Sequence, residues 1–99
     1  MSAYELTHHP AVAHDLWQAL VWYARIDPRI STRFVEEFWT VVNRVRESPE
    51  HCAADHCGKR RARLHGFPYM LIYELHGETV HVLCLSHGSR NPEFWGRRQ

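Results

Sequence analysis

The apolar positions of the chain follow a helical period in its first half and a strand period in its second half. Between Pro10 and Asp27, apolar residues recur at i, i+3, i+4, i+7 and i+11, which predicts an amphipathic helix. Pro10 suits the first turn of this helix, where its missing N–H costs nothing. We expect the buried stripe of the helix to consist of Ala13, Leu16, Trp17, Leu20 and Ala24.

A second helix is predicted directly after the first. Asp27 and Pro28 interrupt the first helix and have the residue types of an N-cap and a first helical position. Ser48-Pro49 ends the second helix at about Glu47, because a residue before proline is disfavoured in the helical conformation. The short link predicts an antiparallel helical hairpin. The apolar stripe of the second helix is Phe34, Phe38, Val41, Val42 and Val45.

Strand patterns stand on both sides of the helices. Residues 3–7 alternate and predict a short strand, and residues 49–58 form a polar loop. Beyond this loop, alternation over residues 60–65, a nine-residue apolar run over 67–75 and a returning run over 79–86 predict three strands. Gly66 and the His76-Gly77-Glu78 stretch mark the turns between them.

This order of elements predicts an α+β fold of the form βααβββ. We expect a single domain over residues 1–99, with the N-terminal strand and the helical hairpin packed on one face of an antiparallel sheet. The other face of the sheet is then open and is the expected place of function. The residues expected to be mostly buried are Trp17, Leu20, Phe34, Phe38, Val41, Tyr69, Leu71 and Val82.

Composition supports a globular protein. Hydrophobic residues make up 44% of the 99 residues, too many for a disordered chain. No apolar run approaches the length of a membrane helix and the N-terminus lacks a signal-peptide pattern, so we expect a cytoplasmic protein with no membrane partner. Three cysteines without framework spacing fit reduced thiols.

Charge is distributed unevenly along the chain. Residues 1–58 carry five Arg against eight Asp and Glu, whereas residues 59–99 carry seven Lys and Arg against three Glu. The positive excess of the C-terminal part suggests an anionic partner for one face of the molecule.

A cluster of cations begins the second half. Strand alternation places Arg61, Arg63 and His65 on one side, with Lys59 and Arg60 beside them. Guanidinium groups suit phosphate oxygens because they donate paired hydrogen bonds. A solvated outer face that keeps the sheet in solution would have the same composition, so both interpretations remain open.

Two further segments carry potential chemistry. His87 and Arg90 follow the last strand; an imidazole can transfer protons and an Arg can stabilise a developing phosphorane charge, but His87 can equally be a strand-end residue bonded to backbone. The loop His51-Cys52-Ala53-Ala54-Asp55-His56-Cys57 offers five potential ligands in seven residues. A closed zinc site takes ligand pairs from two separated places, so we expect neither a metal nor a cofactor.

The ordered set of local sequences resembles the ParE/RelE superfamily of bacterial toxins, most closely the ParE-like or plasmid-stabilisation members. The resemblance covers nearly the whole chain. It rests on residues 11–16 (Ala-Val-Ala-His-Asp-Leu), Trp22-Tyr23 with Asp27-Pro28, Phe34, Arg60-Arg61 before Phe67-Pro68-Tyr69 and Tyr73, and the closing residues 87–95 (His-Gly-Ser-Arg-Asn-Pro-Glu-Phe-Trp).

The resemblance implies the toxin of a type II toxin–antitoxin system that causes growth arrest. A cognate antitoxin would wrap a helix and an extended segment around the toxin, and operator DNA would be bound only through the antitoxin. A basic face would suit an acidic, initially disordered partner. The residues expected to bind the target or the antitoxin are Lys59, Arg60, Arg61, Arg63, Arg90, Trp95, Arg97 and Arg98.

Two activities are compatible with the resemblance. A ParE-like toxin is not an enzyme and inhibits DNA gyrase. A RelE-like toxin is a ribosome-dependent mRNA endoribonuclease, and here its catalytic residues would be Arg61, Arg63, His87 and Arg90. Phe94-Trp95 stands where a catalytic Tyr often occurs, and Lys59 is the only lysine of the chain. Both departures favour the gyrase branch.

Overall fold

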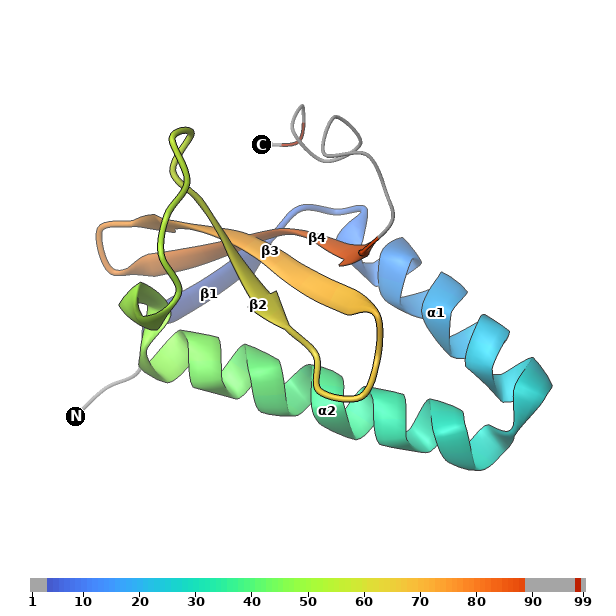
Figure 1. Ribbon diagram of the computed structural model, residues 1–99. Coiled ribbons are helices and arrows are strands. Elements are labelled where there is room, and N and C mark those ends of the chain that lie inside the picture. The colour runs from blue at the N-terminus through green and yellow to red at the C-terminus, as the bar shows by residue number, and fades with distance from the viewer. Residues whose placement is uncertain (1–3, 89–97, 99) are drawn as a thin grey trace.

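The computed structural model describes residues 4–88 and 98. Its order of elements confirms the predicted βααβββ arrangement, with one additional short 3₁₀ turn, η1, at Pro49–His51 (Figure 1). The helices are α1 (Val12–Ile26) and α2 (Pro28–Glu47), and the strands are β1 (Glu5–His8), β2 (Lys59–Arg63), β3 (Tyr69–His76) and β4 (Thr79–His87).

The four strands form one sheet in the order β1-β4-β3-β2. The three C-terminal strands pair antiparallel, as predicted, whereas β1 pairs parallel to β4. A parallel pair needs a long crossover connection, and the helical hairpin with β2 and β3 supplies it. Gly77 has a φ of +61° at the first position of the two-residue turn between β3 and β4, as a type II′ hairpin requires.

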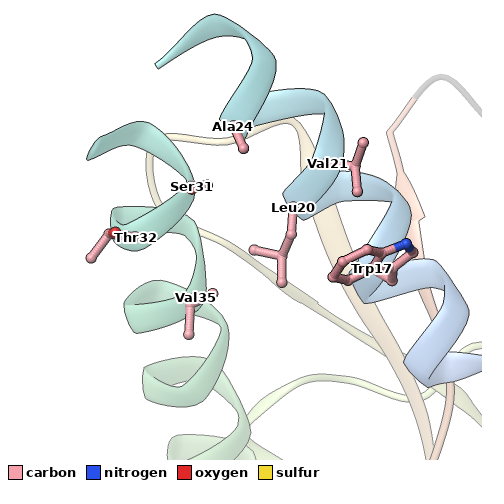
Figure 2. A pocket seen from close by; sticks show the side chains of 7 residues that line it. All are labelled: Trp17, Leu20, Val21, Ala24, Ser31, Thr32 and Val35. Carbon is pink, nitrogen blue, oxygen red and sulfur yellow. The ribbon is translucent and has the colours of Figure 1, made fainter. Parts of the chain in front are cut away.

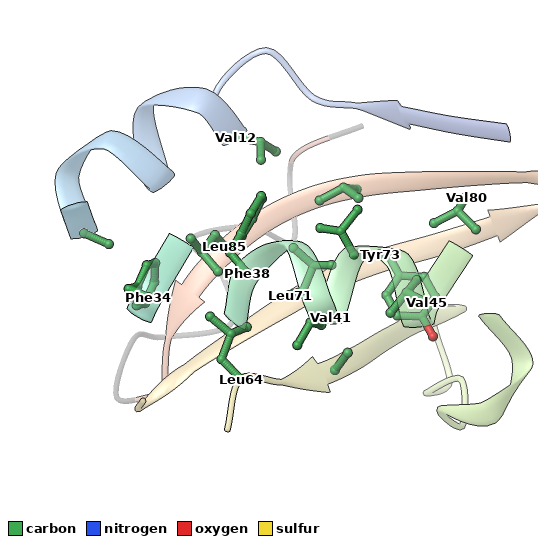
Figure 3. Packing of buried hydrophobic residues seen from close by; sticks show 14 residues of the cluster. Val12, Phe34, Phe38, Val41, Val45, Leu64, Leu71, Tyr73, Val80 and Leu85 are labelled. Carbon is green, nitrogen blue, oxygen red and sulfur yellow. The ribbon is translucent and has the colours of Figure 1, made fainter. Parts of the chain in front are cut away.

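The two helices lie on one face of the sheet and are joined through Asp27 alone (Figure 1). The Asp27 carboxylate accepts a hydrogen bond from the N–H of Arg29 at 2.9 Å, and Pro28 is the first helical residue, so the predicted cap is confirmed. The whole predicted stripe of α2, from Phe34 to Val45, is buried in the main core. Figure 3 shows this core between α2 and the strands, including Leu71, Tyr73, Val80 and Leu85.

The predicted buried face of α1 is wrong. Trp17 is 64% exposed, and the fully buried residues are Val12, Asp15 and Ala19. Leu20 is only partly buried, as is Tyr69 on β3. Helix α1 carries apolar residues around much of its circumference, so its period did not single out one face. The side of α1 that packs on the core carries Val12 and Ala19, with Leu16, Leu20 and Tyr23 partly buried beside them.

The face of the sheet away from the helices is not open over its whole width. Ile72, Leu83 and Cys84 are fully buried there in a second cluster, with Met70 packed against it. The register slips by one residue between Ile72 and Tyr73, which makes Leu83 an extra residue of β4. Because of this bulge, two successive apolar residues point to the same face. The expectation of an open face therefore holds along the edge strands β1 and β2 but not over the middle of the sheet.

Candidate functional site

The exposed cations of β2 lie on the side of the sheet away from the helices. Ala62 and Leu64 are buried in the main core, so the alternating Arg61 and Arg63 point the other way, and both are exposed. The prediction that His65 lies with them is wrong: His65 follows the end of β2, its N–H donates to the Glu37 carboxylate of α2, and it lines a pocket against that helix. We call Arg61 and Arg63 the basic row. Its arginines lie opposite Ile72 and Met70 of β3 in register. Their aliphatic stems can cover that apolar pair while their charged ends stay in water.

Lys59 is engaged within the sheet. Its Nζ lies 3.2 Å from Glu74 Oε2, and its side chain is only 13% exposed. Glu74 also contacts Nε2 of His76 at 3.0 Å. Burial raises the pKa of Glu74, but the hydrogen bonds from His76 and Lys59 outweigh it, and the net effect lowers this pKa. Much of the charge of Lys59 is therefore offset inside the protein.

Arg60 points to the helix side of the sheet. It pairs in register with Tyr73, whose ring is in the main core. Its Nη1 donates a hydrogen bond of 2.6 Å to the carbonyl of Cys52, and its Nε is buried without a hydrogen-bond partner. The Tyr73 hydroxyl donates to the carbonyl of Pro49 at 2.7 Å, and burial raises the pKa of Tyr73. Arg60 and Tyr73 thus fasten the loop before β2, and Arg60 is not part of the basic row.

Arg61 has an acidic neighbour in that loop. Its Nη2 lies 3.7 Å from Oδ2 of Asp55, and both side chains are partly exposed. The other oxygen, Oδ1, accepts hydrogen bonds from the N–H groups of Cys57 and Lys59 at 2.8 and 3.0 Å. The backbone hydrogen bond from Lys59 is the largest effect that lowers the pKa of Asp55. The loop therefore holds an ionised carboxylate beside the basic row.

His87 lies on the opposite side of the sheet from the basic row. It pairs in register with Tyr69, and the two rings meet edge to face at 5.2 Å. Tyr69 in turn contacts Tyr23 of α1 and Phe34 of α2. His87 also lines a pocket of about 170 Å³ against α1, together with Asp15, Gln18, Trp22, Tyr69 and Leu85. The structure therefore does not bring His87 to the face that carries Arg61 and Arg63.

Arg98, predicted as a binding residue, lies in an internal ion pair. Its guanidinium contacts the carboxylate of Asp15 at 2.6 and 3.2 Å and donates to the carbonyl of Leu83 at 3.0 Å. Asp15 also accepts a hydrogen bond from the N–H of Leu85 at 3.2 Å. The contact with Asp15 raises the pKa of Arg98. This role of Asp15 was not predicted from the sequence. The signal that could have indicated it is the helical spacing of Val12, Asp15 and Ala19, which places the carboxylate on the same helix face as two small apolar residues.

Three other predicted residues, Arg90, Trp95 and Arg97, lie outside the described part of the chain. Sequence reasoning did not anticipate an exposed apolar surface on the helical hairpin. Trp17, Trp22 and Ile26 of α1 are 64%, 60% and 61% exposed. Trp17 and Trp22 line one pocket on α1, and exposed aromatic side chains that lie together indicate a contact site for another protein. Ile26 lies on a different side of the helix, nine positions after Trp17.

A groove runs between the two helices at this surface. Its volume is about 230 Å³. Figure 2 shows the α1 side chains Trp17 and Leu20 directed toward the groove from one side. The complete lining is Trp17, Leu20, Val21, Ala24, Ser31, Thr32 and Val35. We call it the hairpin groove. The apolar side chains that line the hairpin groove can pack against apolar side chains of a partner segment.

Potential metal ligands meet at one place in the described part of the chain. Asp55, His56 and Cys57 each offer one ligand atom, and these atoms all lie within 4.8 Å of one another. Among residues 4–88 and 98, no helix is both long enough and apolar enough to cross a membrane.

The fold and these surfaces define a class of small α+β proteins with a helical hairpin on one face of a four-stranded sheet and cations along its edge strand. A family model described as "ParE toxin of type II toxin-antitoxin system, parDE" matches residues 6–92. The chain therefore belongs to the ParE toxin family.

Solved structures agree at the level of the fold. A chain from a structure titled "Chromosomal ParDE TA system from P. aeruginosa" is similar with a TM-score of 0.74 and 17% sequence identity. The similarity covers 86% of this chain and 96% of that chain. No curated protein sequence matches this chain.

Proposed function

We propose that this protein is the toxin of a parDE-type pair, that it acts in the cytoplasm by inhibiting DNA gyrase, and that a cognate antitoxin neutralises it. Membership of the ParE family supports the toxin role. The exposed apolar residues of α1 support a protein partner. Operator DNA would be bound through the antitoxin.

The position of His87 is the observation that favours gyrase inhibition over RNA cleavage. Attack by a 2′-hydroxyl requires a proton-transfer group and cations around one phosphate, within hydrogen-bond reach of it. His87 belongs to the helix side of the sheet, whereas Arg61 and Arg63 point away from the helices. The sheet backbone lies between them, so these groups do not converge on one phosphate.

The basic row is the part of the predicted binding set that is placed for contact with a target. Arg61 and Arg63 are exposed on an edge strand, where an acidic segment of protein or a DNA backbone can approach them. Lys59, Arg60 and Arg98 are held by contacts within the protein. We therefore assign target binding first to Arg61 and Arg63.

A supercoiling assay with purified gyrase tests the proposal. The wild-type toxin should inhibit supercoiling, and the double variant Arg61→Ala/Arg63→Ala should need about tenfold more protein for half inhibition, since interface arginines often contribute strongly to binding. Arg44→Ala removes an exposed charge from the end of α2 and should leave the inhibition unchanged. Cleaved mRNA in a translation extract, lost in His87→Ala, together with no effect on gyrase, would replace this proposal by the ribonuclease activity.

A further inference from the structure

The loop before β2 brings three different metal-ligating groups to one exposed turn. The carboxylate, imidazole and thiol of Asp55, His56 and Cys57 have ligand atoms within 4.8 Å of one another. Around a tetrahedral zinc ion, bonds of ~2.0–2.3 Å place ligand atoms roughly 3.5 Å apart. His56 and Cys57 are exposed, so rotation of their side chains can close the remaining distance. Cys57 is a free thiol.

Backbone hydrogen bonds hold the turn in shape. The N–H of Asp55 donates to the carbonyl of Lys59 at 2.8 Å, and the N–H of Gly58 donates to the carbonyl of Asp55 at 2.9 Å. Gly58 has a φ of +80°, a conformation that favours glycine. Asp55 Oδ1 is fixed by two backbone N–H groups, which leaves Oδ2 directed outward to Arg61. The start of β2 at one end of the turn and the fixed carboxylate reduce the ordering that a bound ion would require.

We propose that this turn is an open surface site for a divalent ion of zinc-like chemistry, with Asp55 Oδ2, an imidazole nitrogen of His56 and the Cys57 thiolate as ligands. Solvent would complete the coordination, and the thiol proton would pass to water on binding. One oxygen, one nitrogen and one sulfur ligand suit Zn²⁺ and disfavour Mg²⁺ or Ca²⁺, which prefer oxygen.

This site differs from the closed zinc site that the sequence spacing argues against. All three ligands come from consecutive residues, and among residues 4–88 and 98 no second pair joins them: Cys84 is fully buried in the second cluster, and Cys52 is outside the group of ligand atoms. With three protein ligands and an exposed position, the site would bind reversibly and would not be needed for folding.

The site is also adjacent to the basic row. Arg61 Nη2 lies 3.7 Å from the carboxylate oxygen that would ligate the ion. A cation and the guanidinium therefore compete for Asp55 Oδ2, since both are attracted to the same negative charge. Removal of the guanidinium should increase metal affinity, because it removes both this competition and a nearby positive charge.

Titration of the tag-free, reduced protein with Zn²⁺ tests the site, with Co²⁺ as a spectroscopic probe of thiolate ligation. Wild type should bind one ion, and Co²⁺ should show a thiolate charge-transfer band. Cys57→Ser and His56→Ala should each weaken Zn²⁺ binding by about tenfold or more. Even the loss of a residue that only hydrogen-bonds a ligand lowers metal affinity by about this factor, and the loss of a ligand itself should lower it at least as much. Arg61→Ala should bind Zn²⁺ about two- to tenfold more tightly.

The same loop offers matched controls. Cys52→Ser and His51→Ala remove the same chemical groups a few residues earlier and should change the affinity less than twofold. The proposal is overturned if the wild type binds no Zn²⁺, if the control variants lose binding as much as the ligand variants, or if Co²⁺ shows no thiolate band. Circular dichroism of every variant shows whether a lost site reflects lost folding.

Discussion

Asp15 is a helical carboxylate whose role depends on residues far away in the chain. The edge of β4 extends beyond β1, which ends opposite Val82. Asp15 and Arg98 satisfy the backbone groups of Leu83 and Leu85 on this uncovered edge. The pair is largely buried, with 13% and 3% of the Arg98 and Asp15 side chains exposed. Its charges and hydrogen bonds form one local network.

We predict that Arg98→Ala lowers the free energy of unfolding by about 3 kcal/mol, because it leaves the Asp15 carboxylate buried without its counterion. The double variant Asp15→Asn/Arg98→Met should lose at least ~1 kcal/mol less free energy of unfolding than the single variants Asp15→Asn and Arg98→Met lose together. The Asn side chain can still accept the hydrogen bond from the Leu85 N–H. Urea unfolding of Arg98→Ala, Asp15→Asn, Arg98→Met and the double variant measures these losses of stability. Additive costs would show that the two residues are not coupled.

The arginines at positions 60 and 61 show how strongly neighbouring residues of a strand can differ. Arg60 points to the helix side and fastens the loop through the Cys52 carbonyl, whereas Arg61 is exposed on the other face. Alternation along β2 predicted their separation, but it did not show which of them would be enclosed. That depended on where η1 and the following loop pack.

At the scale of single elements, the two helices differ in how well their sequences defined a buried face. Helix α2 has one apolar stripe between polar sides, and all five stripe residues are buried. Helix α1 has apolar residues on several sides, and its contact with the sheet was predicted one position away from the observed one. Periodicity identifies a face only where the rest of the helix is polar.

We expect Phe38→Ala to lower the free energy of unfolding by about 3–5 kcal/mol, because it empties a buried position of the main core. Trp17→Ala should change it by less than about 0.5 kcal/mol, since this side chain is mostly exposed. Thermal and urea unfolding of the two variants compare the faces directly. A large loss in Trp17→Ala with little loss in Phe38→Ala would contradict the observed packing.

At the scale of the whole molecule, the sheet separates two kinds of surface. The helix side presents the hairpin groove with its exposed Trp17, and the far side presents the basic row on β2. A toxin that must meet both a target and a neutralising partner can use two such surfaces. We assign the hairpin groove to the antitoxin, because apolar grooves take the apolar face of a helix that orders on binding.

This assignment predicts that Trp17→Ser weakens binding of the cognate antitoxin by about tenfold or more, because aromatic anchors dominate such interfaces. Trp39 of α2 is 51% exposed but does not line the hairpin groove, so Trp39→Ser is the matched control. Isothermal titration calorimetry compares the variants. Equal losses in both, or loss in Trp39→Ser alone, would place the antitoxin elsewhere.

The sequence by itself determined the order and type of the elements, the cap at Asp27, the buried stripe of α2 and the alternation of β2. These features depend on neighbouring residues, since helix and strand periods, caps and turns are local. The family resemblance from the same residues is confirmed by the family match.

Only the tertiary structure decided which side of α1 is buried, that a bulge at Leu83 closes part of the second face, and that His87 and the basic row lie on opposite sides of the sheet. The Asp15–Arg98 pair, whose members are 83 positions apart along the chain, was decided in the same way. Such features depend on the packing of segments that are remote in sequence. No local period carries that information, because it arises only when the helices and the sheet meet.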